Sequence, residues 1–320
     1  MKKRLLCMMI LLVAVLVSCA STQSSRYREG SNVGQETGMT VEDERRLTEE
    51  ALPKMLKDYP PAQNKELQKY VSDLGMKIVK ANNLDGNPYH YDFTVVDVTD
   101  VNAFAMPAGK IFVTAPLIAA ASNEAELAGV ISHKIGHVVA RHSAERMYAM
   151  EKEGKKTWMY AAGGAVLGAA VGYGLGRMIC GPDDTACHAK AALLGGAVGA
   201  GGGMLAQKYT FLVNSREDEM EADRLGFKYA VGAGYDKDQV GKFYEKLLQM
   251  EKNAQKGGTP LLKSLADAMS THPPSEERVS QMRELAQSSP AAKKSIVTSP
   301  EFNRARLAAA GLQKKASDKK

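Results

Sequence analysis

The chain has 320 residues, enough for one large domain or two small ones. Its apolar share of 44% and its charged share of 24% are typical of a globular protein that buries a core. The formal net charge is +6. Without residues 1–18, which contain three basic residues, 39 basic and 36 acidic residues leave a net charge of +3. A charge this small and this scattered argues against a nucleic-acid partner.

The N-terminus has the pattern of an export signal. Three of the first four residues are basic, and residues 5–17 form an apolar run that is shorter than the roughly 20 residues needed to span a bilayer. The run ends in Leu-Val-Ser-Cys, which resembles the lipobox of bacterial lipoproteins. We therefore predict a lipoprotein signal peptide over residues 1–18 and lipidation of Cys19. The alternative is an ordinary secretory signal followed by an incidental cysteine.

The cysteines fit an exported protein. Cys7 lies in the predicted signal and Cys19 takes the lipid, which leaves Cys180 and Cys187 as a pair in an oxidising compartment. We predict a disulfide between them, with two free thiols as the alternative. The residue after the predicted lipidated cysteine is Ala20 and not an aspartate. In this the chain resembles lipoproteins anchored in the outer membrane, and we expect its folded part on the periplasmic face.

A flexible tether is expected between the lipid anchor and the folded domain. Residues 19–39 are rich in serine, threonine, glutamine and glycine and show no apolar periodicity. Thr40 is a candidate N-cap, because three acidic residues follow it where the helix dipole favours negative charge. A second helix is predicted over residues 62–81. Its apolar residues recur on one face, at Leu67, Val71, Leu74, Ile78 and Val79.

Two strands and a long helix are predicted next. Residues 91–98 are β-branched and aromatic, and residues 110–114 have the same character. Between them, Pro107 and the glycine two residues later mark a turn. A helix is predicted over residues 122–147, with Ser122 as its N-cap.

Residues 157–207 contain two uncharged segments, 157–176 and 191–207, that are rich in glycine and alanine. Each is long enough to suggest a membrane span, but large aliphatic residues are few, and glycine and alanine favour close helix packing instead. We predict a helical hairpin, with Cys180 and Cys187 at its tip, that packs on protein, on a second copy of the chain or on an assembly partner. A hairpin inserted in the membrane is the alternative.

The last third of the chain predicts further helices. Helical patterns cover three segments, which are residues 214–232, 237–252 and 275–285. Ser215 and Asp236 are the candidate N-caps of the first two. Residues 270–274, Ser-Thr-His-Pro-Pro, break the chain. Residues 286–320 are polar, and we expect a tail that wraps around the domain or frays.

Two histidines, His133 and His137, are four residues apart. Histidines with this spacing face the same side of a helix, so both rings can reach one metal ion. Glu219 and Asp223 have the same spacing. Glu219 can complete a site of two histidines and one carboxylate, and Asp223 can orient a histidine ring through its other nitrogen. Taken separately, the histidine pair is equally compatible with a coincidence on a surface or in a core, and the carboxylate pair is more typical of two solvated carboxylates on a helix surface.

Taken together, these motifs resemble those of metallopeptidase family 48, the gluzincin family of HtpX and the CAAX prenyl proteases. Its members carry H-E-x-x-H, then S-R-x-x-E-x-x-A-D, and then a late T-H-P. The matching segments here are His133 to His137, Ser215 to Asp223, and Thr271 to Pro273. Residues 102–109, Asn-Ala-Phe-Ala-Met-Pro-Ala-Gly, are close to the N-A-F-A-x-P-x-G of the family's edge strand. The lipobox and short tail are similar to the periplasmic lipoprotein members, and the resemblance covers residues 42–285.

The resemblance implies an α+β fold, with a mainly helical, zincin-like domain over residues 40–285 and a small sheet that edges a zinc cleft. It implies one zinc ion per chain, with His133, His137 and Glu219 as ligands and Asp223 behind them.

The resemblance also implies residues that handle the substrate. Asn102 and Phe104 match the edge strand that pairs with an extended substrate backbone. His272 and Arg278 match late positions near the cleft, where they can donate hydrogen bonds to the tetrahedral oxyanion. The alternatives are a loop-capping role for His272 and, for Arg278, a surface salt bridge to one of the two glutamates that precede it.

Lys134 departs from the family pattern, which has the catalytic glutamate at this position. By the resemblance, that glutamate is the general base that takes a proton from the attacking water and passes it to the leaving amine. A charged lysine has three donors and no acceptor, and a neutral lysine beside a metal ion is a poor base. Loss of a general base typically costs about 10²–10⁴ in rate. Glu126 lies two turns before His133, roughly 10 Å along the helix, too far to replace it.

The leading hypothesis is a zinc-dependent endopeptidase, anchored to the membrane by its lipid, that cleaves unfolded or misassembled envelope proteins and is impaired by Lys134. One rival is a zinc-binding pseudoprotease that binds clients or assembly partners without cutting them. A second rival is a non-enzymatic envelope lipoprotein whose glycine- and alanine-rich hairpin mediates assembly. Zinc content separates the second rival from the other two hypotheses. A digestion assay separates the first rival, the pseudoprotease, from the active endopeptidase.

Overall fold

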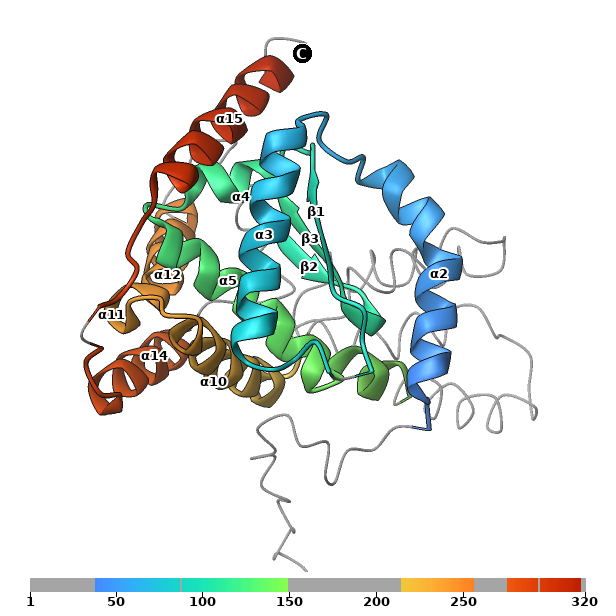
Figure 1. Cartoon of the computed structure of the whole chain (residues 1–320), viewed down its shortest axis with the longest axis horizontal. Helices are drawn as coiled ribbons and strands as arrows, with labels where there is room; N and C mark the ends of the chain where they lie inside the picture. The colour runs from blue at the N-terminus through green and yellow to red at the C-terminus, as the bar shows by residue number, and fades with distance from the viewer. Residues whose placement is uncertain (1–37, 87, 149–213, 256–274, 293, 318–320) are drawn as a thin grey trace, which may run out of the picture.

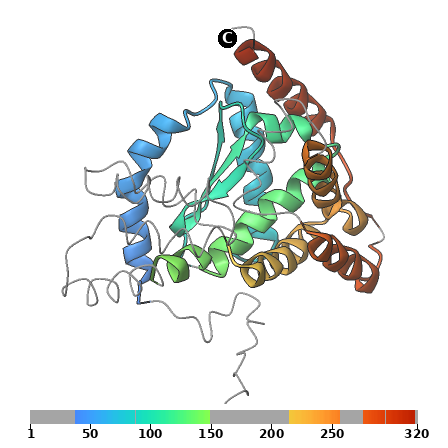
Figure 2. The same ribbon diagram turned by 180° about the vertical axis from the view of Figure 1, so that it is seen from behind.

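Residues 38–86, 88–148, 214–255, 275–292 and 294–317 are described by the structure, a computed structural model. In these residues, helices surround a small three-stranded sheet (Figures 1 and 2). The predicted α+β, mainly helical fold is confirmed.

Two helices precede the sheet. Helix α2 (Val41–Asp58) starts at the predicted N-cap Thr40, which forms a capping box. Helix α3 (Lys65–Ala81) starts later than predicted, after the N-cap Asn64. The reason is that the amide of Ala62 donates to a carbonyl of the first strand, so the chain is still extended there. The predicted apolar face of α3 is buried.

The strands are β1 (Asp92–Val96), β2 (Ala103–Ala105) and β3 (Lys110–Thr114), in the order β1-β3-β2. Strand β1 runs parallel to β3, and β2 runs antiparallel to β3, so β2 lies at an edge. Strand β3 has the predicted bounds, and β1 is shorter than predicted. The predicted turn is a 3₁₀ segment in which Ala108 and Gly109 have φ angles of 61° and 95°.

Two helices follow the sheet, α4 (Ala115–Ala120) and α5 (Glu124–Val139). The N-cap of α5 is Asn123, one residue after the predicted cap. The helix also ends earlier than predicted, because the backbone of Arg141 takes a left-handed φ of 54°. Residues 142–148 then form a separate helical segment.

The two faces of the sheet pack against different helices. One face, made by Phe93, Val95, Ile111 and Val113, joins the main core with α3 and α5. The other face, made by Val96, Phe104 and Phe112, packs against α2. This division follows the period-two alternation of side chains along a strand. Figure 1 shows α3 crossing the strands and α2 to one side of them.

Further helices follow after residue 213. They are α10 (Arg216–Gly232), α11 (Lys237–Val240), α12 (Lys242–Gln255) and α14 (Glu276–Ser288). Ser215 and Asp236 cap α10 and α11 as predicted. The single helix predicted over residues 237–252 is divided at Gly241 into α11 and α12.

The predicted polar tail contains helix α15 (Pro300–Ser317), which packs against α4 and α3. Phe302, Ala305 and Ala309 are buried along one stripe of this helix. Of the two expectations for residues 286–320, wrapping around the domain or fraying, α15 corresponds to the first, because it packs on the domain. Its apolar stripe is narrow and lies among polar residues, so only the tertiary structure reveals the surface that it covers.

Several predictions concern residues outside the described ranges. These are the signal peptide, Cys19, most of the tether, the hairpin with Cys180 and Cys187, and His272. None of the helices that the structure describes combines the length and the apolar character needed to cross a bilayer.

Candidate metal centre

Helix α5 presents His133 and His137 on the same side. The helix is buried along nearly its whole length. The Nε2 atoms of the two rings lie 3.0 Å apart, and the rings are perpendicular, with centroids separated by 4.5 Å. The spacing of four residues thus directs both nitrogens to one point, as predicted.

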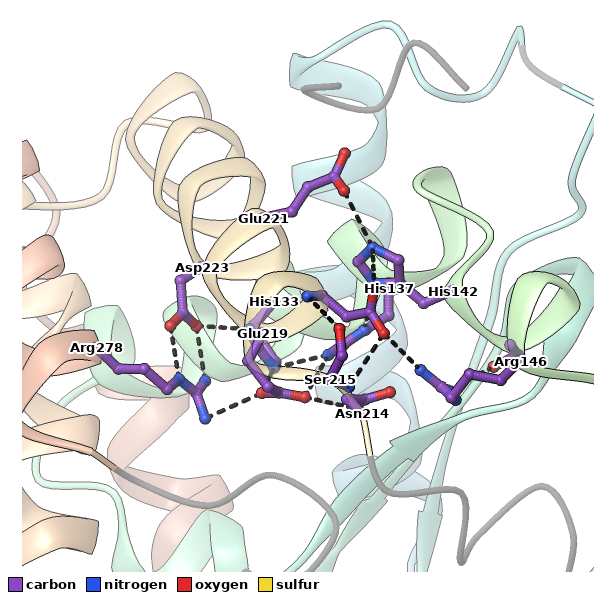
Figure 3. Close-up of polar contacts among 12 residues, drawn as sticks. His133, His137, His142, Arg146, Asn214, Ser215, Glu219, Glu221, Asp223 and Arg278 are labelled. Carbon is purple, nitrogen blue, oxygen red and sulfur yellow. Dashed lines mark hydrogen bonds and ion pairs between the residues drawn. The ribbon is translucent and has the colours of Figure 1, made fainter. Parts of the chain in front are cut away.

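Helix α10 brings Glu219 to this point (Figure 3). One carboxylate oxygen of Glu219 lies 3.3 Å from Nε2 of His133, and the other lies 3.3 Å from Nε2 of His137. The side-chain amide of Asn214 donates to Glu219. One turn further along α10, Asp223 lies 2.8 Å from Nδ1 of His133. Asp223 is therefore placed to orient the His133 ring, as predicted.

Two glycines allow α5 and α10 to approach this closely. A Cβ atom at Gly226 would lie 2.7 Å from the backbone nitrogen of His133. A Cβ atom at Gly136 would lie 2.9 Å from the carbonyl oxygen of Ala222. Both distances are shorter than real Cβ contacts, so the convergence of the side chains depends on glycine at these two positions.

His133, His137 and Glu219 form a donor set that fits a zinc ion. One ligand atom from each lies within 4.8 Å of the other two, and all three side chains are buried. Burial lowers the pKa of His137 well below its ordinary value, although Glu219 acts in the opposite direction. A neutral ring has a lone pair for a metal ion. Two imidazoles and a carboxylate are a typical protein ligand set for zinc.

Arg278 holds the two carboxylates of α10. It is 4% exposed, and its Nε and Nη2 atoms each donate to Asp223 at 2.7 Å. Its Nη1 atom lies 2.9 Å from Glu219. Burial alone would raise the pKa of Asp223, but Arg278 and His133 hold it below its ordinary value. Asp223 is therefore an ionised carboxylate with a partner on each side.

This geometry changes the expected roles of Arg278. The alternative of a surface salt bridge is wrong, because Arg278 is buried while Glu276 and Glu277 pair with Lys252 and Arg216. The guanidinium is directed at the α10 carboxylates, so we assign it the role of holding them. The oxyanion role implied by the resemblance stays a prediction.

Lys134 lies inside the same buried site. Its side chain is 4% exposed, and it lines a pocket of about 50 Å³ together with Asn102, Ala103 and Arg278. Burial lowers the pKa of Lys134 to about 7, although the neighbouring Glu219 carboxylate raises it. A pocket of this size has room for only a few water molecules.

No carboxylate replaces the missing glutamate among the described residues that line this pocket. Glu126 is bonded elsewhere: its carboxylate accepts the amide of Ser122 at 2.9 Å and lies 3.2 Å from Nζ of Lys246. These contacts engage the Glu126 carboxylate with residues that do not line this pocket.

The edge strand offers different backbone atoms from those expected. The backbone of Asn102 is bonded to Thr114 at the end of β3, and the ring of Phe104 packs on the face covered by α2. Because hydrogen bonding alternates along an antiparallel pair, the backbone groups that point away from β3 belong to Ala103 and Ala105. A peptide added to this edge would pair with those two residues, and Asn102 lines the pocket beside them.

A second layer of polar side chains lies behind His137, and sequence reasoning missed it. His142 places its Nδ1 atom 2.8 Å from Nδ1 of His137. Its Nε2 atom lies 3.2 Å from Glu221 and 3.7 Å from Asp218. A spacing of five residues does not place two side chains on one helix face. His142 returns beside His137 only because the chain turns at Arg141.

Comparison with known proteins gives a consistent result. The model of "Peptidase family M48" matches residues 61–286. The chain is 29% identical over 220 residues to the beta-barrel assembly-enhancing protease of Escherichia coli (strain K12), covering 69% of this chain and 39% of that protein. It is 28% identical over 261 residues to a putative beta-barrel assembly-enhancing protease of Vibrio cholerae, covering 81% of this chain and 48% of that protein. It is 32% identical over 188 residues to the mitochondrial metalloendopeptidase OMA1 of Arabidopsis thaliana, covering 59% and 30% respectively. Each match spans less than half of the relative's own length.

Proposed function

The chain belongs to peptidase family M48, and from this membership we propose that it is a zinc-dependent endopeptidase of the bacterial envelope whose hydrolytic step is impaired by Lys134. The observation that carries the proposal is the convergence of His133, His137 and Glu219, whose ligand atoms lie within 4.8 Å of one another. At the position where the family has its glutamate base, this chain has Lys134. The family and the named relatives make the chain a metallopeptidase in general. The metal, the location, the substrates and the degree of activity are part of the proposal.

The residues around the pocket have different roles in this proposal. His133, His137 and Glu219 would hold a zinc ion, which would supply Lewis acidity for the hydrolysis of a peptide bond. Arg278 keeps Glu219 and Asp223 in place, and Asp223 orients His133. Lys134 occupies the place of the base. Its charged form donates hydrogen bonds and accepts no proton, and its neutral form, which a pKa of about 7 makes accessible, is a poor base beside a metal ion.

The substrate class follows from the edge strand. Ala103 and Ala105 have small side chains and offer backbone groups, and pairing with backbone groups selects an extended chain with little preference for its side chains. Unfolded or misassembled proteins expose such segments. The export pattern and Cys19 support a site of action at the periplasmic face of the outer membrane. The name of the Escherichia coli relative, a beta-barrel assembly-enhancing protease, supports envelope substrates as well.

A second function, a zinc-binding pseudoprotease that holds clients without cutting them, is favoured by one observation. Among the described residues that line the pocket, no aspartate or glutamate is present to act as a base. The two functions share the zinc site and the edge strand, and they differ only in hydrolysis.

The deciding experiment restores the carboxylate. Lys134→Glu should create or raise chelator-sensitive digestion of an unfolded protein such as casein by about 10²–10⁴-fold, because it supplies a proton acceptor at the metal site. Lys134→Gln is the matched control, since it removes the charge and keeps the size of glutamate but supplies no base. Zinc content is measured on the same purified full chains, and about one zinc ion per chain is expected.

Each outcome separates the hypotheses. Digestion by the unchanged chain at the rate of Lys134→Glu would mean that another residue serves as the base. A Lys134→Glu chain that binds zinc but cuts nothing would favour the pseudoprotease. A chain that purifies without metal, and whose melting temperature does not respond to added zinc, would contradict the zinc site and leave the non-enzymatic lipoprotein.

A further inference from the structure

The pair formed by His142 and Glu221 is buried behind the metal centre and has no part in the mechanism described so far. The His142 side chain is 0% exposed and that of Glu221 is 1% exposed. Figure 3 shows the two side chains in line with His137, on the side of that ring away from His133 and Glu219. A buried imidazole and a buried carboxylate are costly unless their hydrogen bonds are satisfied.

We propose that His142 and Glu221 are positioning residues that fix the tautomer and the ring orientation of His137 for metal binding. The inference rests on the proposed zinc site and extends it to a function for a third histidine.

The order of the protons follows from the contacts. A neutral histidine that binds a metal through Nε2 carries its proton on Nδ1. The Nδ1–H group of His137 therefore donates to Nδ1 of His142, 2.8 Å away. His142 then carries its own proton on Nε2 and donates it to the Glu221 carboxylate at 3.2 Å.

The reverse order is disfavoured by the two carboxylates near His142. If Nδ1 of His142 carried the proton, its Nε2 lone pair would face Glu221 at 3.2 Å and Asp218 at 3.7 Å. Acceptors would then face acceptors in a buried environment, which is unfavourable. Arg146 lies 3.6 Å from Asp218 and adds a positive charge on the far side of that carboxylate.

The two ligand histidines are thus held in parallel ways. His133 has a carboxylate, Asp223, directly at its Nδ1 atom. His137 reaches its carboxylate, that of Glu221, only through the imidazole of His142. Glu221 is two residues after Glu219, so it points about 200° away from Glu219 around α10. His142 spans the gap between His137 and Glu221.

The backbone turn at Arg141 places His142 beside His137. At Arg141, a residue that is not glycine has a φ of 54°, which is costly without compensation. The Arg141 side chain is held by Glu44, with Nε 2.6 Å from its carboxylate, and by the carbonyl of Met39 at 2.7 Å. Helix α2 therefore stabilises the turn that returns His142 to the ring of His137.

The test measures zinc affinity by competition with a chelating indicator, together with the folding of the metal-free chain by circular dichroism. His142→Leu removes the relay and should weaken zinc binding by about 10- to 100-fold. His142→Asn keeps a short polar acceptor near Nδ1 of His137 and should recover most of this loss. His90→Leu, at an exposed histidine far from the site in sequence, should leave zinc affinity unchanged.

Two further measurements address the relay itself. Adding Glu221→Leu to His142→Leu should cause little further loss, because the relay is already interrupted. In the unchanged, zinc-loaded chain, two-bond proton–nitrogen NMR correlations of the histidines should show His142 with its proton on Nε2.

The inference is overturned if His142→Leu binds zinc within about threefold of the unchanged chain, or if Leu and Asn weaken binding equally. A proton on Nδ1 of His142 would also overturn it. If His142→Leu does not fold, the Asn variant and the NMR result decide. Weaker zinc binding in His142→Leu, together with normal binding in the unchanged chain, supports this inference. Normal binding in both chains would overturn this inference and leave the proposed zinc site standing. No zinc binding in the unchanged chain would overturn both.

Discussion

At the scale of single residues, the site depends on a buried arginine that sequence reasoning had assigned to substrate or to the surface. Arg278 is the partner of Asp223 and Glu219, and both carboxylates are at most 2% exposed. The ring of Tyr244 lies beneath the guanidinium, with the ring centroid 4.9 Å from the central carbon. Removing one partner of a buried ion pair leaves an uncompensated charge, which is far more costly than breaking a pair on the surface.

Arg278→Met should therefore lower the free energy of unfolding of the metal-free chain by about 3–5 kcal/mol. The matched control is Arg283→Met on the same helix, where the arginine is 62% exposed and pairs with Glu245. The control should change the free energy by less than about 1 kcal/mol. Urea unfolding followed by circular dichroism measures both, and equal effects of the two substitutions would contradict the assignment of Arg278.

At the scale of elements, the candidate site is a contact between α5 and α10. Each helix carries two of the four side chains, His133 and His137 on α5, Glu219 and Asp223 on α10. Their spacing fixes each pair along its own helix, whereas the distance between the pairs depends on how closely the helices pack. Gly226 sets that distance, because its α-carbon faces the backbone of His133.

Gly226→Ala should push the two helices apart. The added methyl group would lie 2.7 Å from the His133 nitrogen, and overpacking of this kind typically costs about 1–3 kcal/mol. Zinc affinity should fall as well, because Glu219 moves away from the histidines. The control is Gly311→Ala in α15, where the methyl group meets nothing within 4 Å and should stabilise the helix by up to about 1 kcal/mol. Unchanged zinc affinity in Gly226→Ala would refute the dependence on this contact.

At the scale of the whole molecule, the C-terminal helix belongs to the same core as the site. Ser299 caps α15 by accepting the amide of Phe302 at 3.0 Å, and its hydroxyl donates to Glu124 at the start of α5. The Tyr235 hydroxyl donates to the same carboxylate at 2.8 Å. The helix that carries the candidate ligand histidines is thus joined at its N-terminal end to α15, which begins at Pro300.

Phe302→Ala should destabilise the full chain by about 3–5 kcal/mol, because Phe302 is 0% exposed and fills the space between α15 and the core. Leu307→Ala, on the same helix but 71% exposed, should change stability by less than about 0.5 kcal/mol. Urea midpoints of the two variants give the comparison. If the two substitutions have equal effects, α15 does not pack on the core in solution.

The sequence by itself determined the features that depend on local interactions. Thr40, Ser215 and Asp236 cap their helices as predicted, because a cap involves a side chain and amides only two or three residues away. The buried face of α3 follows from apolar periodicity. The spacing of four between His133 and His137 is likewise a property of one helix, so the most specific part of the site was readable before any packing was known.

Tertiary structure alone decided the contacts between segments distant in sequence. Arg278 meets Asp223 across 55 residues, and Glu221 meets His142 across 79. Neither pair has a periodic signal, because the relative placement of two helices depends on glycine contacts and core packing rather than on spacing. The end of α5 at Arg141 was missed for the same reason: its left-handed turn is held by Glu44, 97 residues earlier in the chain. Local rules therefore predicted which side chains can face a metal ion, and long-range packing decided which side chains hold them in place.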